Sequence, residues 1–320
     1  MQPREYGCTG RTGRDVKTWN VRRQIGHVGI GRSATVEAAD RPSCGLCGAR
    51  ELYLDDQAVR AAAEADPTAF VRHDSGYPEA VRRDPGRRRA RFFDSYVTDL
   101  VSRDVQQISD IERPAEMRRL LSVVAARMAT LAVAESMATD VAMPRRTLSR
   151  YLDLLELVFV IKRIPAWSSN LTTRAISTPK LIVTDSGLGG RLIGMSEERA
   201  KDPTAPVGPL LENFAIGEVA RQLTWAEEPV QLFHYRDRDQ VEVDMVLEHA
   251  SGAVIGIEVK SAESVHADDF RGLQHLARRL GDRFRAGIVL YAGEQQLSFG
   301  DRLAALPMSA LWVLTDSASA

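Results

Sequence analysis

The sequence predicts an α+β protein of several domains, with an irregular N-terminal region, a helical middle and a final domain of mixed helices and strands. Residues 1–50 keep no helical or strand periodicity for more than a few residues. Apolar residues recur at helical spacing between 92 and 156, and they alternate with polar residues between 231 and 260. We expect domains at 1–75, 76–195 and 208–315, with a polar linker at 196–207.

The composition limits the compartment and the partners. The formal net charge is −1, so a nucleic-acid partner has to be recognised by a local patch. No apolar run is long enough to cross a membrane, and the N-terminus lacks the layout of a signal peptide, which predicts a cytoplasmic protein without a membrane partner. Cys8, Cys44 and Cys47 fit a reducing compartment. The last two have zinc-knuckle spacing, but no second pair follows, which favours structural or incidental thiols.

The middle region predicts helices in the order of a winged helix-turn-helix. Six of the ten residues 82–91 are Arg, and they precede the first helix. Helices are expected at 92–108, 115–134, 134–138 and 145–156. Strands follow near 158–161 and 180–185. This order places the helix at 145–156 where a recognition helix would enter the major groove of DNA.

Arginines of this region are the candidates for contacts with nucleic acid. Arg145, Arg146 and Arg150 lie on the expected recognition helix, where Thr147 and Ser149 could also meet DNA. Arg87 and Arg88 belong to the Arg-rich stretch. That stretch either contacts phosphates or is a solvated helix start. The winged helix either binds DNA or serves as a packing module.

The last third predicts helices at 209–223 and 267–280 and strands near 231–236, 241–248, 253–260 and 286–291. Because side chains alternate along a strand, Glu258 and Lys260 share one face of theirs, and Asp244 points away from its apolar neighbours. If the strands that carry them form a hairpin, the three side chains converge.

Such a set of two carboxylates and one lysine suits phosphodiester hydrolysis. Carboxylate oxygens can hold Mg²⁺, which also takes a phosphate oxygen. The lysine can orient the attacking water or offset the charge that develops on the phosphate. The same residues could instead form a cross-strand pair on an exposed face.

Asp244, followed after thirteen residues by Glu258-Val259-Lys260, resembles the PD-(D/E)xK signature of the restriction-endonuclease-like superfamily. The resemblance implies a restriction-endonuclease-like α/β fold, with Asp244, Glu258 and Lys260 as catalytic residues. It also implies a glutamate on the preceding helix as a further metal ligand, and Glu212 holds the matching position. Glu218 on that helix ranks second, and Gln274 is a weaker additional candidate.

Motifs over roughly residues 76–315 resemble a prokaryotic family of AAA-type predicted ATPases. They are Gly76 to Ala80, Phe92 to Tyr96, Tyr151 to Glu156, Pro179-Lys180-Leu181, Gly208 to Glu212, Tyr235 to Asp239 and Glu242-Val243-Asp244. In that family a P-loop ATPase module precedes a winged-helix segment and a nuclease-like domain of unassigned function.

The ATPase part of the family pattern is incomplete here. Gly26 to Ser33 has the spacing of a phosphate-binding loop, but Arg32 replaces the lysine and no apolar strand leads into it. Residues 1–75 therefore predict a truncated, degenerate remnant of an ATPase module, partly disordered. We expect no ATP hydrolysis.

Together these features predict a nucleic-acid-associated protein with an Mg²⁺-dependent nuclease site and no working ATPase. The alternative is a non-enzymatic module that binds DNA or a protein through the winged helix. A third reading is a decayed gene product with no present function. The sequence does not decide whether the partner is DNA, RNA or a protein.

Overall fold

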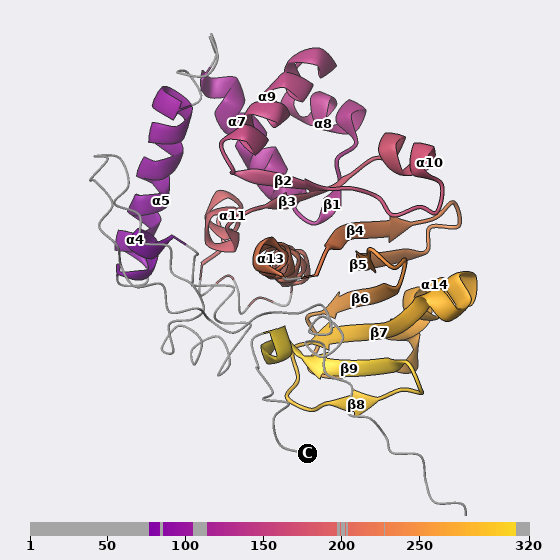
Figure 1. Ribbon diagram of the computed structural model, residues 1–320. Coiled ribbons are helices and arrows are strands. Elements are labelled where there is room, and N and C mark those ends of the chain that lie inside the picture. The colour runs from indigo at the N-terminus through magenta and orange to yellow at the C-terminus, as the bar shows by residue number, and fades with distance from the viewer. Residues whose placement is uncertain are drawn as a thin grey trace, which may run out of the picture.

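The computed structural model describes residues 77–83, 86–104, 114–196, 199, 202, 204–226 and 228–311. The degenerate P-loop, the three cysteines and the rest of the expected ATPase remnant up to residue 75 lie outside them. The described residues form an α+β fold, in which helices with a small sheet lie beside a larger mixed sheet (Figure 1). None of the described helices combines the length and the apolar content needed to cross a membrane.

The first described helices are α4 (Pro78–Val81) and α5 (Arg87–Asp99), and a π-helical turn, Leu100–Asp104, continues α5. The helix expected from residue 92 therefore begins at Arg87 and takes in part of the Arg-rich stretch. Its apolar side buries Phe93 and, in the π-helical turn, Leu100. Arg89 is also buried, and its Nε donates to a backbone carbonyl of α4 at 3.1 Å.

The next unit packs three helices against a three-stranded sheet. In chain order its elements are α7 (Pro114–Ala126), β1 (Thr130–Leu131), α8 (Ala134–Val141), α9 (Arg145–Leu157), β2 (Ile161–Ile164) and β3 (Lys180–Val183). β3 is central and antiparallel to both neighbours. α10 (Leu171–Ile176) lies between β2 and β3, and α11 (Ser186–Leu192) follows β3.

Several boundaries predicted for this unit are wrong, and two of the differences have a cause in the backbone. The helix expected at 115–134 ends at Ala126, and Thr130–Leu131 form a strand instead. The positive φ of 60° at Ala129 is incompatible with a right-handed helix, so the chain turns there. The strand expected at 158–161 begins only at Ile161, after Phe159 with a φ of 58°.

The last unit is built on a six-stranded sheet in the order β4-β5-β6-β7-β9-β8. Its elements are α13 (Val207–Gln222), β4 (Val230–Arg236), β5 (Glu242–His249), β6 (Val254–Lys260), α14 (Arg271–Leu280), β7 (Phe284–Tyr291), β8 (Leu297–Ser298) and β9 (Leu303–Pro307). β4, β5 and β6 are antiparallel, whereas β7 runs parallel to β6 across the connection through α14. The sequence pattern predicted neither β8 nor β9.

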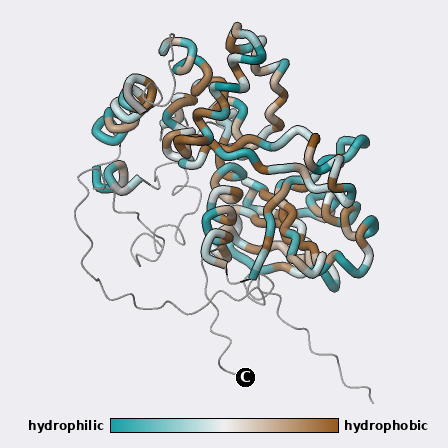
Figure 2. The backbone as a smooth tube through the Cα atoms, turned by 45° about the horizontal axis from the view of Figure 1, so that its top comes forward, coloured by the Kyte–Doolittle hydropathy of each residue, from teal (hydrophilic) through white to brown (hydrophobic). Residues whose placement is uncertain are grey.

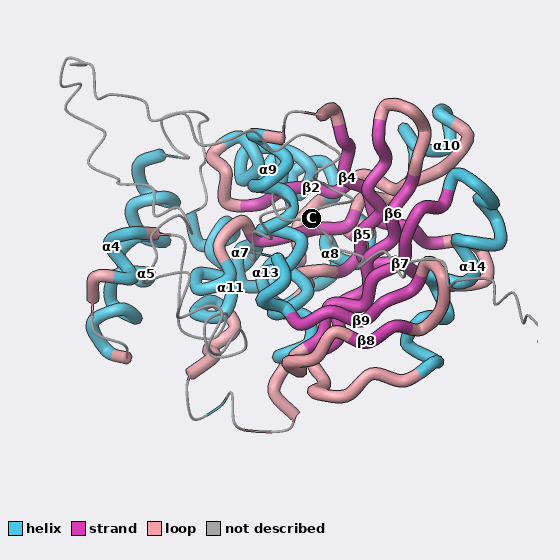
Figure 3. The backbone as a smooth tube through the Cα atoms, turned by 60° about the horizontal axis from the view of Figure 1, so that its bottom comes forward, coloured by secondary structure: helices cyan, strands magenta, loops and turns pink. Residues whose placement is uncertain are grey.

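Both faces of this sheet are buried, with α13 and α14 on opposite sides (Figure 3). Met245 and Ile257 belong to the apolar cluster that includes α13, while Val246 and Val254 pack with Leu273 of α14. Hydrophobic stretches therefore run along the strands at the middle of the molecule (Figure 2). Such two-sided burial requires a polar side chain in these strands to have a specific partner.

The small and the large sheet are joined at β3, α13 and β4. Asn213 of α13 is 1 % exposed, and its side-chain amide exchanges two hydrogen bonds of 2.8 Å with the amide and the carbonyl of Val183 in β3. Ala166, after β2, bridges to His234 of β4. These contacts join the end of β3 to α13 and the segment after β2 to β4.

Candidate functional site

The candidate site lies where β5 and β6 separate. Their register pairs Met245 with Ile257, and the next step would set Asp244 opposite Glu258. There a side chain interrupts the ladder, because Oδ2 of Asp244 accepts a hydrogen bond of 2.9 Å from the amide of Val259. The two strands thus part around a carboxylate that is held in place by the backbone of its neighbour.

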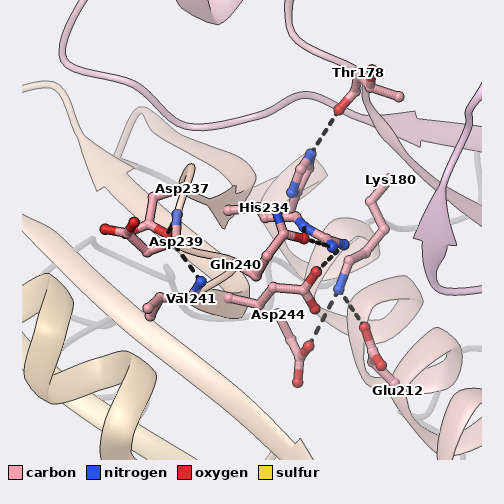
Figure 4. Close-up of polar contacts among 11 residues, drawn as sticks. Thr178, Lys180, Glu212, His234, Asp237, Asp239, Gln240, Val241 and Asp244 are labelled. Atoms are coloured by element: carbon pink, nitrogen blue, oxygen red, sulfur yellow. Dashed lines mark hydrogen bonds and ion pairs between the residues drawn. The ribbon is translucent and has the colours of Figure 1, made fainter.

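Two further charged side chains reach Asp244 from outside the sheet. Glu212 comes from α13, and Lys180 comes from the first position of β3. Nζ of Lys180 lies 2.5 Å from Oε1 of Glu212 and 3.2 Å from Oδ1 of Asp244 (Figure 4). The Lys180 side chain is only 7 % exposed, so these two carboxylates rather than water neutralise its charge.

Glu258 adds a third carboxyl group beside Asp244. One of its oxygens, Oε2, lies 3.8 Å from Nζ of Lys260, whose side chain is 36 % exposed. A Cβ at Gly272 of α14 would come within 2.9 Å of Oε1 of Glu258. The glycine therefore allows α14 to approach this carboxyl group closely, and Lys260 is the member of the set that reaches solvent.

The three carboxyl groups differ in how readily they ionise. Burial, and then the charge of Asp244, raises the pKa of Glu258 well above its usual value. The same two causes raise the pKa of Glu212 to about 8, although Lys180 opposes them. Burial also acts to raise the pKa of Asp244, but the charge of Lys180 and the Val259 amide outweigh it and hold the value below normal. Asp244 is thus the carboxyl that stays ionised, whereas Glu212 and Glu258 hold their protons to higher pH than ordinary glutamates do.

The donor chemistry of this group fits a hard divalent cation such as Mg²⁺, which takes carboxylate oxygens. Among the residues that the structure describes, no three His, Cys, Asp or Glu side chains stand ready to hold a metal as they are placed. The ammonium of Lys180 lies between two of the three carboxyls instead. The donor types therefore fit the metal, while the ammonium of Lys180 contacts the oxygens of Glu212 and Asp244.

His234 lies near Lys180 and gives the folded chain a pH dependence. It is 2 % exposed, and its Nε2 lies 3.1 Å from the carbonyl of Thr178 (Figure 4). Burial, and secondarily the charge of Lys180, lowers its pKa from 6.5 to about 4. Between these values the unfolded chain binds more protons than the folded chain, so stability is lost as the pH falls through this window.

We expect His234→Gln to flatten the loss of stability between about pH 6.5 and about pH 4, because a difference of about 2.5 in pKa corresponds to about 3 kcal/mol. Urea unfolding of wild type and variant across this range measures the effect. His266→Gln, at an exposed position, is the matched control. Equal slopes for His234→Gln and wild type would contradict the assignment.

The structure brings Glu212, Asp244, Glu258 and Lys260 to one place, as the hairpin hypothesis requires. Glu218 lies elsewhere, buried and paired with Arg221 of its own helix. Gln274 is exposed on α14. The site residue that the sequence did not predict is Lys180. Its signals were the motif Pro179-Lys180-Leu181 of the family resemblance and the strand expected at 180–185, and neither indicated a site.

The arginines considered for nucleic-acid binding lie at the surface on two helices. Arg145, Arg146 and Arg150 are exposed on α9, and Arg87 and Arg88 are exposed on α5. Arg145 forms an ion pair of 2.5 Å with Glu135 of α8, and the guanidinium of Arg150 lies 5.6 Å from the ring of Tyr151. The opposite side of α9 is apolar and buried. Thr147 is half-buried on this helix and Ser149 is exposed.

Two family models match separate parts of the chain. Residues 74–199 match the family described as "Domain of unknown function (DUF8612)", and residues 207–311 match "Domain of unknown function (DUF4143)". The chain is similar to Uncharacterized protein Mb2031c of Mycobacterium bovis and Uncharacterized protein Rv2008c of Mycobacterium tuberculosis. Each is 26 % identical over 219 residues, which are 68 % of this chain and 47 % of the relative. No solved structure matches significantly.

Two consequences follow from these matches. The chain spans about half the length of the curated relatives that it matches. The candidate site draws on both matched regions, because Lys180 falls in the first and Glu212, Asp244 and Glu258 fall in the second.

Proposed function

We propose that this chain carries an Mg²⁺-dependent phosphodiesterase site of the PD-(D/E)xK type that acts on nucleic acid. The observation that carries the proposal is the convergence of Glu212, Asp244 and Glu258, with Lys260 beside them, where β5 and β6 part. A cross-strand pair on an exposed face, the other reading of these residues, would not bury two carboxyls below 10 % exposure. The chain would act without a working ATPase of its own, as a protein related to the AAA-type predicted ATPases.

The surrounding elements support this assignment. The carboxylates stand on two antiparallel strands, with α13 before the sheet and α14 after β6. This is the setting that resemblance to the restriction-endonuclease-like superfamily implies, with the glutamate of the preceding helix turned toward the strands. The register that opposes Asp244 and Glu258 supports a joint role for both.

Each residue of the site then has a distinct task. Asp244, Glu258 and Glu212 would hold the metal ion, and the backbone amide of Val259 fixes the orientation of Asp244. Bound there, Mg²⁺ would supply charge to a phosphate oxygen and lower the pKa of a water molecule. Lys260, which is the exposed member, would approach the phosphodiester from solvent and offset the negative charge that develops on it.

Incubation of the purified chain with single-stranded and duplex DNA and RNA tests this function. We expect cleavage with Mg²⁺ or Mn²⁺ and none with EDTA. Lys260→Ala should reduce the rate by at least about 100-fold, the scale of one lost charge-stabilising contact. Lys162→Ala, an exposed lysine on a strand of the small sheet, is the matched control and should leave the rate unchanged. Absence of cleavage under all these conditions, or full activity of Lys260→Ala, overturns the catalytic proposal.

A second candidate function, binding without catalysis, rests on the middle unit. The order α7-β1-α8-α9-β2-β3, with β3 central, agrees with a winged helix-turn-helix, and the exposed arginines of α9 would face DNA. This reading predicts DNA binding that weakens steeply with salt. It also predicts that binding persists in Lys260→Ala and is lost when Arg145, Arg146 and Arg150 are replaced by Ala together.

A further inference from the structure

Lys180 contacts carboxyl groups that belong to a different part of the chain. It precedes Glu212 by 32 residues and Asp244 by 64. Its own backbone is fixed, since it pairs with Leu131 of β1 on one side and with Ile164 of β2 on the other. Movement of the ammonium away from the carboxylates would therefore have to come from the side chain, because the strand holds the backbone in place.

The ammonium is well matched to its surroundings as a cation. Burial acts to lower the pKa of Lys180, but the charges of Asp244 and Glu212 outweigh it and raise the pKa above the ordinary value, so the side chain stays charged. It lies within 3.2 Å of one oxygen from each of two carboxylates. These oxygens are ones that a metal ion in this group of carboxyls would need.

Lys180 is the cation that balances Asp244, while Glu212 and Glu258, whose pKa values are raised, hold their protons to higher pH than ordinary glutamates. Three carboxyls face Lys180 and Lys260, and Lys260 stands at the exposed edge, 3.8 Å from Glu258 alone. Lys180 and a divalent ion cannot both occupy the space between Glu212 and Asp244, because like charges at such a distance repel strongly in a buried site. The position is therefore taken by one cation or by the other.

We propose that Lys180 is a built-in counter-cation that competes with a divalent metal ion for the carboxylates of Glu212 and Asp244. The region before the linker thereby controls metal loading of the region after it. This inference rests on the proposed function in so far as these carboxylates are metal ligands. The inference adds one point to that function: while Lys180 contacts Oε1 of Glu212 and Oδ1 of Asp244, these two oxygens cannot bind a metal ion.

Calorimetric titration of the full chain with Mn²⁺, at neutral pH and without nucleic acid, tests the competition. Lys180→Met should bind one Mn²⁺ at least about tenfold more tightly than wild type, which corresponds to about 1.4 kcal/mol. Lys180→Arg keeps the positive charge and should bind no more tightly than wild type. Lys162→Met, in the neighbouring strand β2, is the control for loss of one positive charge from the small sheet and should also match wild type.

The stability of Lys180→Met gives an independent readout. Removal of the ammonium leaves the buried Asp244 carboxylate uncompensated, so the variant should unfold more readily than wild type in EDTA. Added Mn²⁺ should raise its melting temperature by more than it raises that of wild type, because the ion takes the vacated place. A salt bridge with only a structural role gives the loss of stability without the response to Mn²⁺.

The outcomes separate this inference from the proposed function. Tighter Mn²⁺ binding by Lys180→Met without cleavage of any nucleic acid supports the competition and rejects the phosphodiesterase. Cleavage by wild type, with Mn²⁺ binding unchanged in Lys180→Met, rejects the competition alone. A Lys180→Met chain that stays unfolded even with Mn²⁺ also overturns the competition, since the ion then fails to replace the ammonium.

Discussion

Glu258→Gln should abolish metal-dependent cleavage and, in EDTA, make the folded chain more stable at neutral pH. Cleavage should fall by at least about 1000-fold, because a neutral amide replaces a carboxylate that holds the metal. The gain in stability has a separate cause. Glu258 is 7 % exposed, and burial followed by the charge of Asp244 raises its pKa well above the usual value. Ionisation of this residue therefore costs the folded state more than the unfolded state.

The sign of the effect follows from proton binding. The unfolded glutamate loses its proton near the ordinary pKa of 4.5, whereas the folded one keeps it to higher pH. The stability that Glu258 contributes is thus complete below that value and is lost as the pH rises. Glutamine has nearly the same size and does not ionise, so the stability of the variant does not fall as the pH rises. A residue whose removal stabilises the fold is one that is kept for function rather than for folding.

Urea unfolding in EDTA at about pH 5 and about pH 8 measures this difference, and the advantage of Glu258→Gln should widen at the higher pH. Glu263→Gln, an exposed glutamate soon after the end of β6, is the matched control and should behave as wild type. A wild-type chain at least as stable as Glu258→Gln at the higher pH would contradict the stability argument. Cleavage retained by the variant would contradict the catalytic one.

Local patterns were sufficient for the hairpin that carries Asp244 and Glu258. β5 and β6 lie within one residue of the expected ranges at each end, because alternation of apolar and polar side chains is a property of the strand itself. The spacing to Lys260 follows from the same period. These features need no knowledge of what packs against the sheet, so a single sequence contains them.

Contacts between distant segments were not predictable in this way. The strand Thr130–Leu131 follows a helix whose apolar stripe runs on through Met128, and only pairing with β3 distinguishes strand from helix there. Lys180 meets Asp244 across 64 residues, and a lysine at the start of a strand is ordinarily solvated. Its role depends on how two units dock, which periodicity does not encode.

Asn213→Ala should cost about 3 kcal/mol of stability, the largest loss that we expect from a polar substitution outside the group of carboxyls. The Asn213 side chain accepts a hydrogen bond from the Val183 amide and donates one to the Val183 carbonyl, each 2.8 Å long. It thus continues the pairing of β3 beyond the end of β1. Alanine would remove both bonds and leave a buried amide and a buried carbonyl unsatisfied, and each such group costs about 1–3 kcal/mol.

Chemical denaturation of Asn213→Ala beside Asn170→Ala measures this cost against a matched asparagine. Asn170 caps α10 at an exposed position and accepts one hydrogen bond from Thr173, so its loss should cost about 1 kcal/mol or less. A similar loss for both variants would show that the Val183 pairing adds nothing beyond an ordinary cap.

Because Asn213 follows Glu212 and Val183 lies three residues after Lys180, this pairing also sets the distance between the ammonium of Lys180 and the carboxylate of Glu212. Asn213→Ala should therefore weaken the hold of Lys180 on the site, and Mn²⁺ titration of this variant should show tighter binding than wild type.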